Sequence, residues 1–237
     1  MGKVHFRQIP THVRTFIDDA GIKGPKERYG DAEISPGVRR FVYEHAQIFR
    51  DFMYDAWRSG MTISGLKSAI GMPGIRIVGM VCDEHGRKPD SKKVSKILDW
   101  PEPRSTKDAR AFIGICVYYR IFIPSFSVTA SPIFELFRKG RQFVWTHDCQ
   151  LAMETLQMQL TEAPILITLD YSPSAGMIFL NVDASTIVGW GATLEQMQND
   201  GTRRPARYES GIWNGPEKRY DAVKLECRGL LKALKKF

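Results

Sequence analysis

The stretch GRKPDSKKVSKILDWPEPRSTKDARAFIGICVYYRIFIPSFSVTASPIFELFRKGRQFVW, residues 86–145, predicts a block of short helices. Prolines end the first helix, expected over 91–100, because proline interrupts the helical hydrogen-bond ladder. Ser105 and Asp108 have the spacing of a capping box that opens a second helix. Two further prolines divide shorter helical pieces that end near Gly140. We therefore expect this block to be mainly helical.

On the C-terminal side the pattern stays helical and then changes to strands. Apolar residues from Cys149 to Leu160 recur at helical spacing until a proline ends the helix. Runs over 176–182, 189–194 and 203–210, bounded by Gly, Asp or Asn, then predict three strands.

A last helix is expected to begin at 215–217, with proline in its first turn. Its apolar residues fall on one stripe, which we expect to be buried: Tyr220, Val223, Cys227, Leu230, Leu231, Leu234 and Phe237.

On the N-terminal side the first 35 residues are rich in glycine and proline, and only Val13–Ile17 is expected to be extended. A helix is predicted over 38–59, with Gly60 as its C-cap. Three segments without helical periodicity follow: strands over 61–63 and 75–82, and a polar turn over 83–90.

The net charge of +8 is unevenly distributed along the 237 residues. Residues 1–80 carry +4 and residues 81–145 carry +5, whereas residues 146–237 carry −1. A basic excess is typical of proteins that bind polyanions, although a basic surface that only keeps the protein in solution explains it equally well.

Membrane and secreted classes are not favoured by this sequence. No run reaches the roughly 18 apolar residues of a spanning helix, and the first residues lack a signal core. The four cysteines are scattered without zinc-binding spacing, which indicates reduced thiols. We expect an intracellular protein, cytoplasmic or nuclear, with no membrane partner.

Two pairs of carboxylates stand out as candidate ligands for a divalent cation, which prefers oxygen. Asp18 and Asp19 follow an apolar pair, and an ordinary polar turn or cap explains them as well. Asp183 lies at the end of a predicted strand, and Glu226 borders the apolar stripe of the last helix. If the two face each other they could hold Mg²⁺ for phosphodiester hydrolysis. A surface Asp and a helix-flank Glu are the plain alternative.

In this order, the features resemble the polymerase of a Gypsy-type LTR retrotransposon. The likeness within 86–145 rests on Gly-x-x-Pro-Asp, Lys-Val, Trp-Pro, an Arg-x-Phe-x-Gly helix, Tyr-Tyr-Arg, Phe-Ile-Pro and Phe-x-Trp. ILITLDYSPSAGMIFLNVDAS (165–185) resembles the entry to the retroelement ribonuclease H domain. GWGATLEQ (189–196), RRPARYESGIWNGPEKRY (203–220) and KLECRGLLKALKKF (224–237) resemble its second strand, third strand and first helix.

The resemblance implies an α+β, multi-domain fragment. Residues 1–82 would be the C-terminal part of a reverse-transcriptase palm, and residues 83–163 a mainly helical thumb and connection. Residues 164–237 would be the N-terminal half of a ribonuclease H-like domain, with three antiparallel strands plus the first helix.

The resemblance also assigns roles to the acids, with Mg²⁺ as the implied cofactor. Asp183 matches the first metal ligand of the ribonuclease H domain, and Glu226 matches its helix Glu. FIDD (16–19) is similar to the Tyr-x-Asp-Asp polymerase motif with Phe in place of Tyr, so Asp18 and Asp19 match its metal-binding acids. The sequence AGIKGPKERYG follows where the family has an apolar strand, whereas GVRRFVYEHAQ (37–47) resembles the helix after the motif.

The middle block is expected to hold a template–primer duplex or an RNA–DNA hybrid by its phosphates. The cations assigned to this contact are Arg104, Lys107, Arg110, Arg120, Arg138, Lys139 and Arg141. For any one of these residues, a solvated charged helix face is the plain alternative.

The expected function is that of a fragment of an RNA-directed DNA polymerase and ribonuclease H, with the remainder of a polyprotein as a further partner. The parent family comprises nucleotidyltransferases and endonucleases, but further acids of both active sites are expected outside this sequence. The alternatives are a non-enzymatic nucleic-acid-binding or structural relic, and a pseudogene product that does not fold stably.

The incomplete ligand sets predict that this polypeptide alone does not cleave the RNA strand of a hybrid, because too few acids fix the metal. The measurement is release of labelled RNA in Mg²⁺, with Asp183→Asn as the background. Release above that background would contradict the prediction.

Overall fold

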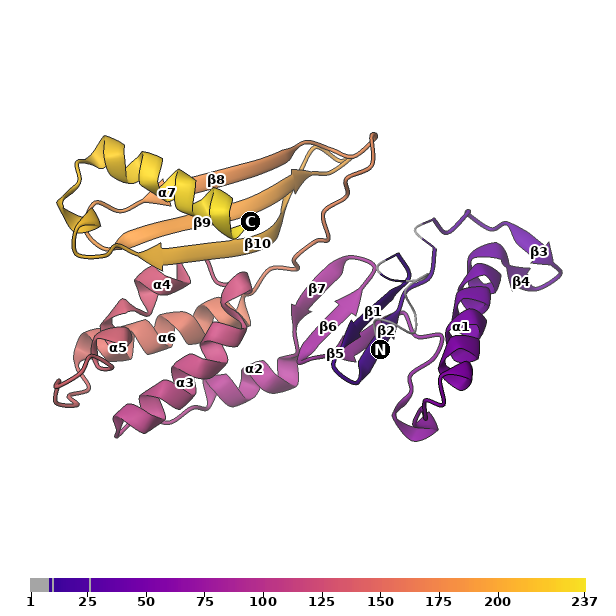
Figure 1. Cartoon of the computed structure of the whole chain (residues 1–237), viewed down its shortest axis with the longest axis horizontal. Helices are drawn as coiled ribbons and strands as arrows, with labels where there is room; N and C mark the ends of the chain where they lie inside the picture. The colour runs from indigo at the N-terminus through magenta and orange to yellow at the C-terminus, as the bar shows by residue number, and fades with distance from the viewer. Residues whose placement is uncertain (1–8, 10, 26) are drawn as a thin grey trace. The chain divides into compact units, whose positions relative to one another are not determined.

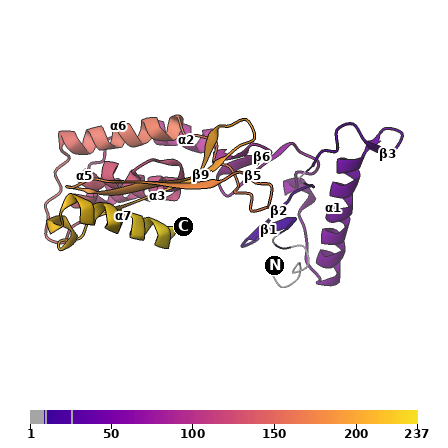
Figure 2. The ribbon, with the colours of Figure 1, turned by 90° about the horizontal axis from the view of Figure 1, so that it is seen from above.

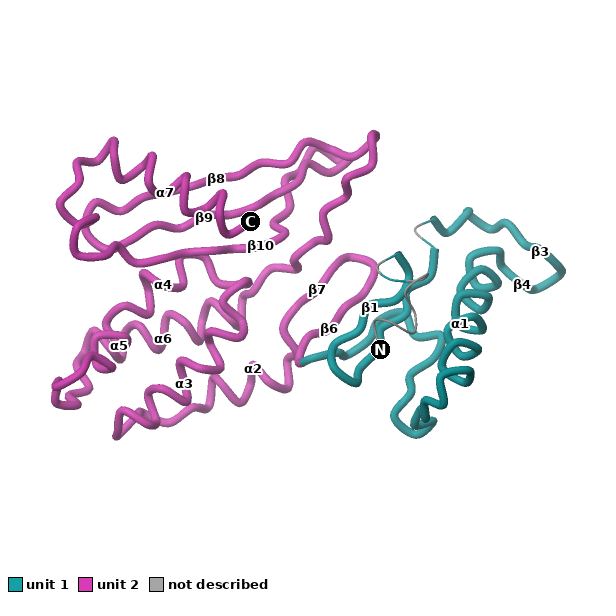
Figure 3. The backbone as a smooth tube through the Cα atoms, viewed as in Figure 1, with its two compact units in different colours: residues 1–78 teal, residues 79–237 magenta. Residues whose placement is uncertain are grey.

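A computed structural model describes residues 9, 11–25 and 27–237, which divide into two units, 1–78 and 79–237 (Figure 3). The first eight residues, on which the expected lack of a signal peptide rests, lie outside the described residues. None of the helices in the described part of the chain combines the length and apolar character that a membrane crossing requires.

The first unit contains a hairpin, a long helix and short extended segments. Its elements are β1 (Val13–Phe16), β2 (Asp19–Ile22), β3 (Glu33–Ser35), β4 (Val38–Arg39), α1 (Arg40–Arg58), η1 (Gly65–Lys67) and β5 (Gly74–Ile77). β1 and β2 pair antiparallel, so the extended segment predicted near residue 13 is confirmed.

The end of α1 explains one wrong prediction, the strand over 61–63. Gly60 has a φ of +68° and donates to Trp57 O, as expected for a C-cap glycine. The N–H of Met61 donates to Ala56 O, which completes a Schellman motif. Because the helix end uses this amide, residues 61–63 do not form a strand.

The second unit begins with a hairpin and a helical block (Figure 1). Its elements are β6 (Met80–Asp83), β7 (Gly86–Pro89), α2 (Ser91–Leu98), α3 (Thr106–Tyr118), η2 (Arg120–Phe122), α4 (Phe126–Thr129), α5 (Ser131–Glu135) and α6 (His147–Thr161). The predicted capping box is confirmed in part, because Ser105 Oγ accepts from the N–H of Asp108 at 3.2 Å.

Two predictions near residue 80 were wrong. The strand expected over 75–82 is divided, because Val78 and Gly79 have positive φ values of 50° and 70°. The segment expected as a polar turn contains β7, which pairs with β6. Arg87 also exchanges two backbone hydrogen bonds of 2.9 Å with Leu166, a partner too distant in sequence to show in the local pattern.

The helical block buries one continuous apolar core. Its largest fully buried side chains are Phe112, Phe122, Ile97, Ile123, Ile133, Leu156, Leu160 and Leu166. Burying such a side chain stabilises the fold by about 1.5–3 kcal/mol. All four cysteines are free, as expected, and burial raises the pKa of the Cys116 thiol to about 12.

A three-stranded antiparallel sheet with one long helix completes the second unit. Its elements are β8 (Ile178–Ala184), β9 (Gly189–Met197), β10 (Arg203–Ile212), η3 (Glu217–Arg219) and α7 (Ala222–Lys236). The order is β10-β9-β8, which confirms the three antiparallel strands and the helix expected from the sequence.

The sheet is covered by α7 on one face and in part by α4 on the other, where Asn181 and Asp183 of β8 stay exposed. Figure 2 shows it edge-on, with α7 on one side and α6 of the helical block on the other. On the helical side, the N–H of Ser127 in α4 donates to Ser210 Oγ at 2.8 Å. A Cβ at Gly191 would lie 2.5 Å from Ser125 Oγ, so glycine permits this close approach.

The predicted start and buried stripe of α7 were both wrong. Residues 217–219 form a separate 3-10 turn, and α7 begins after Asp221, whose side chain caps the N–H of Lys224 at 2.8 Å. The predicted stripe lies largely outward, with Val223 74% and Leu234 60% exposed.

The buried stripe of α7 is instead Leu225, Gly229 and Ala233. A Cβ at Gly229 would lie 3.4 Å from Val182 Cγ1 and 3.5 Å from Ala184 Cβ. The helix approaches the sheet so closely that small residues must face it.

The close approach of β9 to β10 predicts a stability effect. In Gly189→Ala, the new Cβ would lie 2.1 Å from Gly211 O, a backbone atom with no room to move. We expect a loss of about 1–3 kcal/mol in the free energy of unfolding, measured by urea denaturation.

Gly215→Ala is the matched control, because no atom lies within 4 Å of its added Cβ. It should change stability by less than about 0.5 kcal/mol. Equal stability of the two variants would contradict the described strand pairing.

Candidate nucleic-acid interface and carboxylate sites

The first predicted carboxylate pair lies in the tip of the β1–β2 hairpin. Asp19 is paired with Phe16, and Ile17 between the strands has a φ of +54°. Both Asp18 and Asp19 are exposed. A hairpin tip presents the acids to solvent.

Asp183 lies on β8, the edge strand of the three-stranded sheet, and is exposed. Its neighbours Val182 and Ala184 face α7. Because successive side chains of a strand alternate between faces, Asp183 points away from α7. The same outer face carries Asn181, whose Nδ2 donates to Glu195 Oε2 at 2.8 Å.

Glu226 lies on one flank of α7. At about 100° per residue, Glu226 and Arg228 fall on opposite sides of the buried Leu225–Gly229 stripe. Glu226 is exposed, and neither it nor Asp183 has an ion-pair partner in the described ranges. Contact between the two carboxylates would have to pass around the edge of β8, and their convergence stays a prediction.

The implied Mg²⁺ requires more oxygen ligands than these residues supply. Among the described residues, no group of three or more His, Cys, Asp or Glu side chains is placed to hold a metal ion. The residues present therefore do not make up a magnesium centre, and no catalytic step through a metal is derived.

Sequence reasoning missed Glu217, which binds two cations from the interior of α7. Its side chain is only 2% exposed and accepts from Arg228 Nε at 2.8 Å and Lys232 Nζ at 2.7 Å. It also accepts from the N–H of Asn214 at 3.0 Å. Burial raises the pKa of Glu217, but the hydrogen bonds from Lys232, Asn214 and Arg228 outweigh it and lower the pKa to about 2.

The predicted phosphate-binding cations fall into two groups. Arg138 and Arg141 both pair with Glu135, at 2.6 and 3.1 Å, and Arg120 lies 3.9 Å from Glu209. Arg110 lies over the ring of Phe137. The carboxylate partners of Arg120, Arg138 and Arg141 reduce the charge available to a ligand, whereas the ring contact leaves the charge of Arg110 in place.

The second group is without acidic partners. Arg104, Lys107 and Lys139 are exposed, and no ion pair involving their side chains occurs in the part of the chain that the structure describes. Arg104 and Lys107 flank the N-terminus of α3, where the backbone N–H groups also favour an anion.

Sequence reasoning also missed the lysines of α2. Val94 and Ile97 are the buried residues of this helix, so Lys92, Lys93 and Lys96 lie exposed around the rest of it. No ion pair of theirs occurs among the described residues. The spacing of the two apolar residues in SKKVSKIL was the signal that could have identified them.

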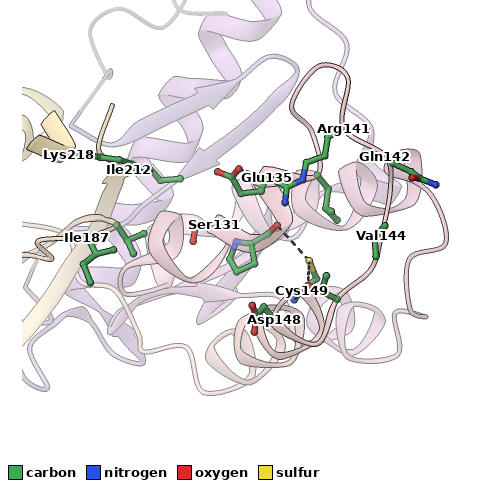
Figure 4. Close-up of a pocket in the computed structure, with 14 residues that line it drawn as sticks. Ser131, Glu135, Arg141, Gln142, Val144, Asp148, Cys149, Ile187, Ile212 and Lys218 are labelled. Atoms are coloured by element: carbon green, nitrogen blue, oxygen red, sulfur yellow. Dashed lines mark hydrogen bonds and ion pairs between the residues drawn. The ribbon is translucent and has the colours of Figure 1, made fainter. Parts of the chain in front are cut away.

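A cavity of about 490 Å³ opens between α5, the start of α6 and the β8–β9 turn (Figure 4). Leu136, Val144 and Ile187 supply apolar lining, and Glu135 and Arg141 lie together at one side. Arg141 is the single predicted site residue among those lining it. The other predicted site residues therefore lie outside this cavity.

Comparison with known families supports the resemblance inferred from the sequence. Residues 145–237 match the RNase H-like domain found in reverse transcriptase. The Tf2-3 and Tf2-4 transposon polyproteins of Schizosaccharomyces pombe are each 28% identical over 225 residues. That alignment covers 95% of this chain and 16% of each polyprotein. The chain is homologous to these transposon polyproteins and spans about one sixth of their length.

Solved structures show the same fold. The foamy viral protease–reverse transcriptase dRH in complex with double-stranded DNA has a TM-score of 0.78 at 21% identity. The match covers 99% of this chain and 38% of that one. The foamy viral protease–reverse transcriptase in complex with RNA/DNA hybrid has a TM-score of 0.77 at 21% identity, covering 99% and 29%. The α/β fold thus resembles part of these reverse transcriptases.

The lowered pKa of Glu217 predicts a pH dependence of stability. Its ionised form is favoured in the folded state, so its contribution is present above pH 4.5 and lost as pH falls from 4.5 toward 2. Glu217→Gln should lose about 2 kcal/mol at pH 7, a value reduced for its partly exposed partners. It should also flatten the decline in stability below pH 4.5, as followed by urea denaturation at several pH values.

Glu102→Gln is the control, because Glu102 is an exposed carboxylate of the same unit. It should keep the wild-type pH profile. A wild-type profile for Glu217→Gln would show that the Glu217 hydrogen bonds do not stabilise α7.

Proposed function

We propose that residues 79–237 bind a template–primer duplex or an RNA–DNA hybrid through its phosphates. The observation that carries this proposal is the set of exposed cations without acidic partners on α2 and at the start of α3: Lys92, Lys93, Lys96, Arg104 and Lys107. Each such cation that contacts a phosphate releases counterions from the nucleic acid.

The remaining predicted cations would contribute less. Arg138 and Arg141 share one carboxylate, so a ligand phosphate would have to compete with Glu135 for them. Lys139 is exposed between them and adds to the local field. Phosphate contacts carry no base information, so we expect binding without sequence preference.

The relatives support this choice of ligand by analogy. Two of the similar foamy viral proteins were solved with double-stranded DNA and with RNA/DNA hybrid. In this proposal residues 1–82 correspond to the end of a palm, 83–163 to thumb and connection, and 164–237 to the first half of a ribonuclease H-like domain. The remainder of a polyprotein is the proposed second partner.

The carboxylates are proposed as parts of the active sites of a longer protein. Asp183 and Glu226 would supply two ligands of a ribonuclease H magnesium site, and Asp18 and Asp19 two ligands of a polymerase site. Their exposure is compatible with that role. The alternative, a non-enzymatic relic that keeps the duplex contact, makes the same binding prediction without metal-dependent chemistry.

The binding proposal predicts that removing the α2 lysines changes how the affinity for nucleic acid depends on salt. The triple variant Lys92→Gln, Lys93→Gln, Lys96→Gln should weaken binding to a labelled RNA–DNA hybrid. It should also reduce the slope of log affinity against log salt by about 2 to 3, because each phosphate contact contributes about 0.9. Fluorescence anisotropy at several salt concentrations measures both quantities.

The control removes three exposed lysines from another helix, Lys224→Gln, Lys235→Gln, Lys236→Gln on α7. It has the same net charge as the α2 variant and should keep the wild-type slope. If the two triple variants lose affinity equally, the interaction is general attraction to a basic protein and the α2 site is not supported.

A further inference from the structure

Three arginines from separate elements meet at strand β10. Arg207 on β10 pairs with Glu209 on the same strand. Arg120, in η2, brings Nη2 to 3.9 Å from Glu209 Oε1. Arg87, in β7, donates from Nη2 to the backbone oxygen of Ala206 at 3.4 Å. We call Arg87, Arg120 and Arg207 the arginine cluster.

The cluster has one carboxylate for three guanidinium groups. Glu209 is buried, with a side chain only 2% exposed, and Arg120 and Arg207 both approach its Oε1 atom. Cys82 lies near Arg87, but burial raises the pKa of its thiol, so it stays neutral at pH 7. Arginine remains charged at that pH, which leaves a local charge of +2.

The guanidinium groups are close enough to affect one another. Burial lowers the pKa of Arg87, Cys82 raises it, and Arg207 lowers it further. Like charges held together in a half-buried place are unfavourable unless an anion joins them. Glu209 compensates one of the three charges.

Hydrogen-bond donors in the cluster are left for a ligand. The Arg207 side chain is 37% exposed, although its Nε atom is buried and has no hydrogen-bond partner among the residues that the structure describes. Arg120 is 43% exposed and meets Glu209 at a distance beyond a hydrogen bond. Guanidinium groups present paired donors that match the oxygens of a phosphate.

The backbone of β10 departs from regular strand pairing beside the arginine cluster. The pairing with β9 shifts register between Pro205 and Arg207, so Ala206 is an extra, bulged residue. Its freed carbonyl oxygen is the acceptor for Arg87. A bulge re-aims neighbouring side chains and occurs often beside functional sites.

We infer that the arginine cluster is a phosphate-binding site, with Glu209 as the counterion that holds Arg120 and Arg207 in place. The ligand is a phosphate group, either a phosphodiester of a bound nucleic-acid strand or a free phosphate ester. This site is distinct from the cations of α2 and α3 and does not depend on the duplex-binding proposal.

Arg120→Gln is the test variant, because Arg120 is half-exposed and its loss leaves the Arg207–Glu209 pair intact. Arg219→Gln removes the same charge from an exposed arginine outside the cluster and is the control. Inorganic phosphate is titrated into the full chain by calorimetry at constant ionic strength. Arg120→Gln should weaken phosphate binding by about tenfold, and Arg219→Gln should not change it.

Arg120→Lys separates charge from geometry. It keeps the positive charge but lacks the paired donors, so phosphate affinity should fall between those of wild type and Arg120→Gln. Phosphate that does not bind wild type, or that binds Arg120→Gln and Arg219→Gln equally, would overturn the inference.

A second experiment measures the affinity of the same variants for an RNA–DNA hybrid, which identifies the source of the phosphate. Loss of hybrid affinity in Arg120→Gln together with loss of phosphate binding assigns the site to the nucleic-acid backbone. Unchanged hybrid affinity assigns it to a free phosphate ester. The α2 triple-lysine variant should keep phosphate binding, so failure of the duplex proposal is distinguishable from failure of this site.

Discussion

The contact between α4 and the sheet joins the helical block to the strands in the second unit. Phe126 at the start of α4 is buried in the helical core, and the next residue, Ser127, donates its backbone N–H to Ser210 on β10. Gly191 on β9 leaves room for Ser125 to pack against the strand. A sheet of three strands must bury an apolar face against another layer to form a core. With α4 on one face and α7 on the other, the proposed duplex-binding cations and the Asp183 strand belong to one unit.

Close packing also decides which residues of the sheet region remain available for binding. α7 approaches the strands through Leu225, Gly229 and Ala233, and its other large apolar residues, such as Val223 and Leu234, face outward. Glu217 uses its two oxygens to hold Arg228 and Lys232, so these cations serve the fold. The cations of α2 have no such partner in the part of the chain that the structure describes, and the helix buries Val94 and Ile97 instead. Local packing thus decides whether a cation stabilises the fold or remains available to a ligand.

Local sequence patterns predicted the elements whose partners are near in the chain. The ends of α1 and α3 depend on Gly60 and Ser105, and both could be identified from turn and cap chemistry. The strand β7 was missed although its partner β6 is near in the chain, because Gly86–Pro89 is a polar run without the apolar residues that mark a strand. Its bridge to Leu166 joins residues far apart in the sequence. The buried stripe of α7 was missed too, because hydrophobicity favours the large residues while close packing selects Gly229. For the sites, sequence reasoning found the exposed acids and Arg120, but it missed Glu217 and the meeting of Arg120 with Arg87 and Arg207, which occurs only in the folded chain.

Native-state hydrogen exchange in low denaturant tests most directly whether residues 79–237 form one cooperative unit. The slowest amides of α6, in the helical core, are compared with those of β9, at the centre of the sheet. If α4 couples them, both sets should exchange with the same free energy of opening and the same dependence on denaturant. Exchange of β9 at a clearly lower free energy, with its own denaturant dependence, would show that the sheet opens separately and would contradict this account.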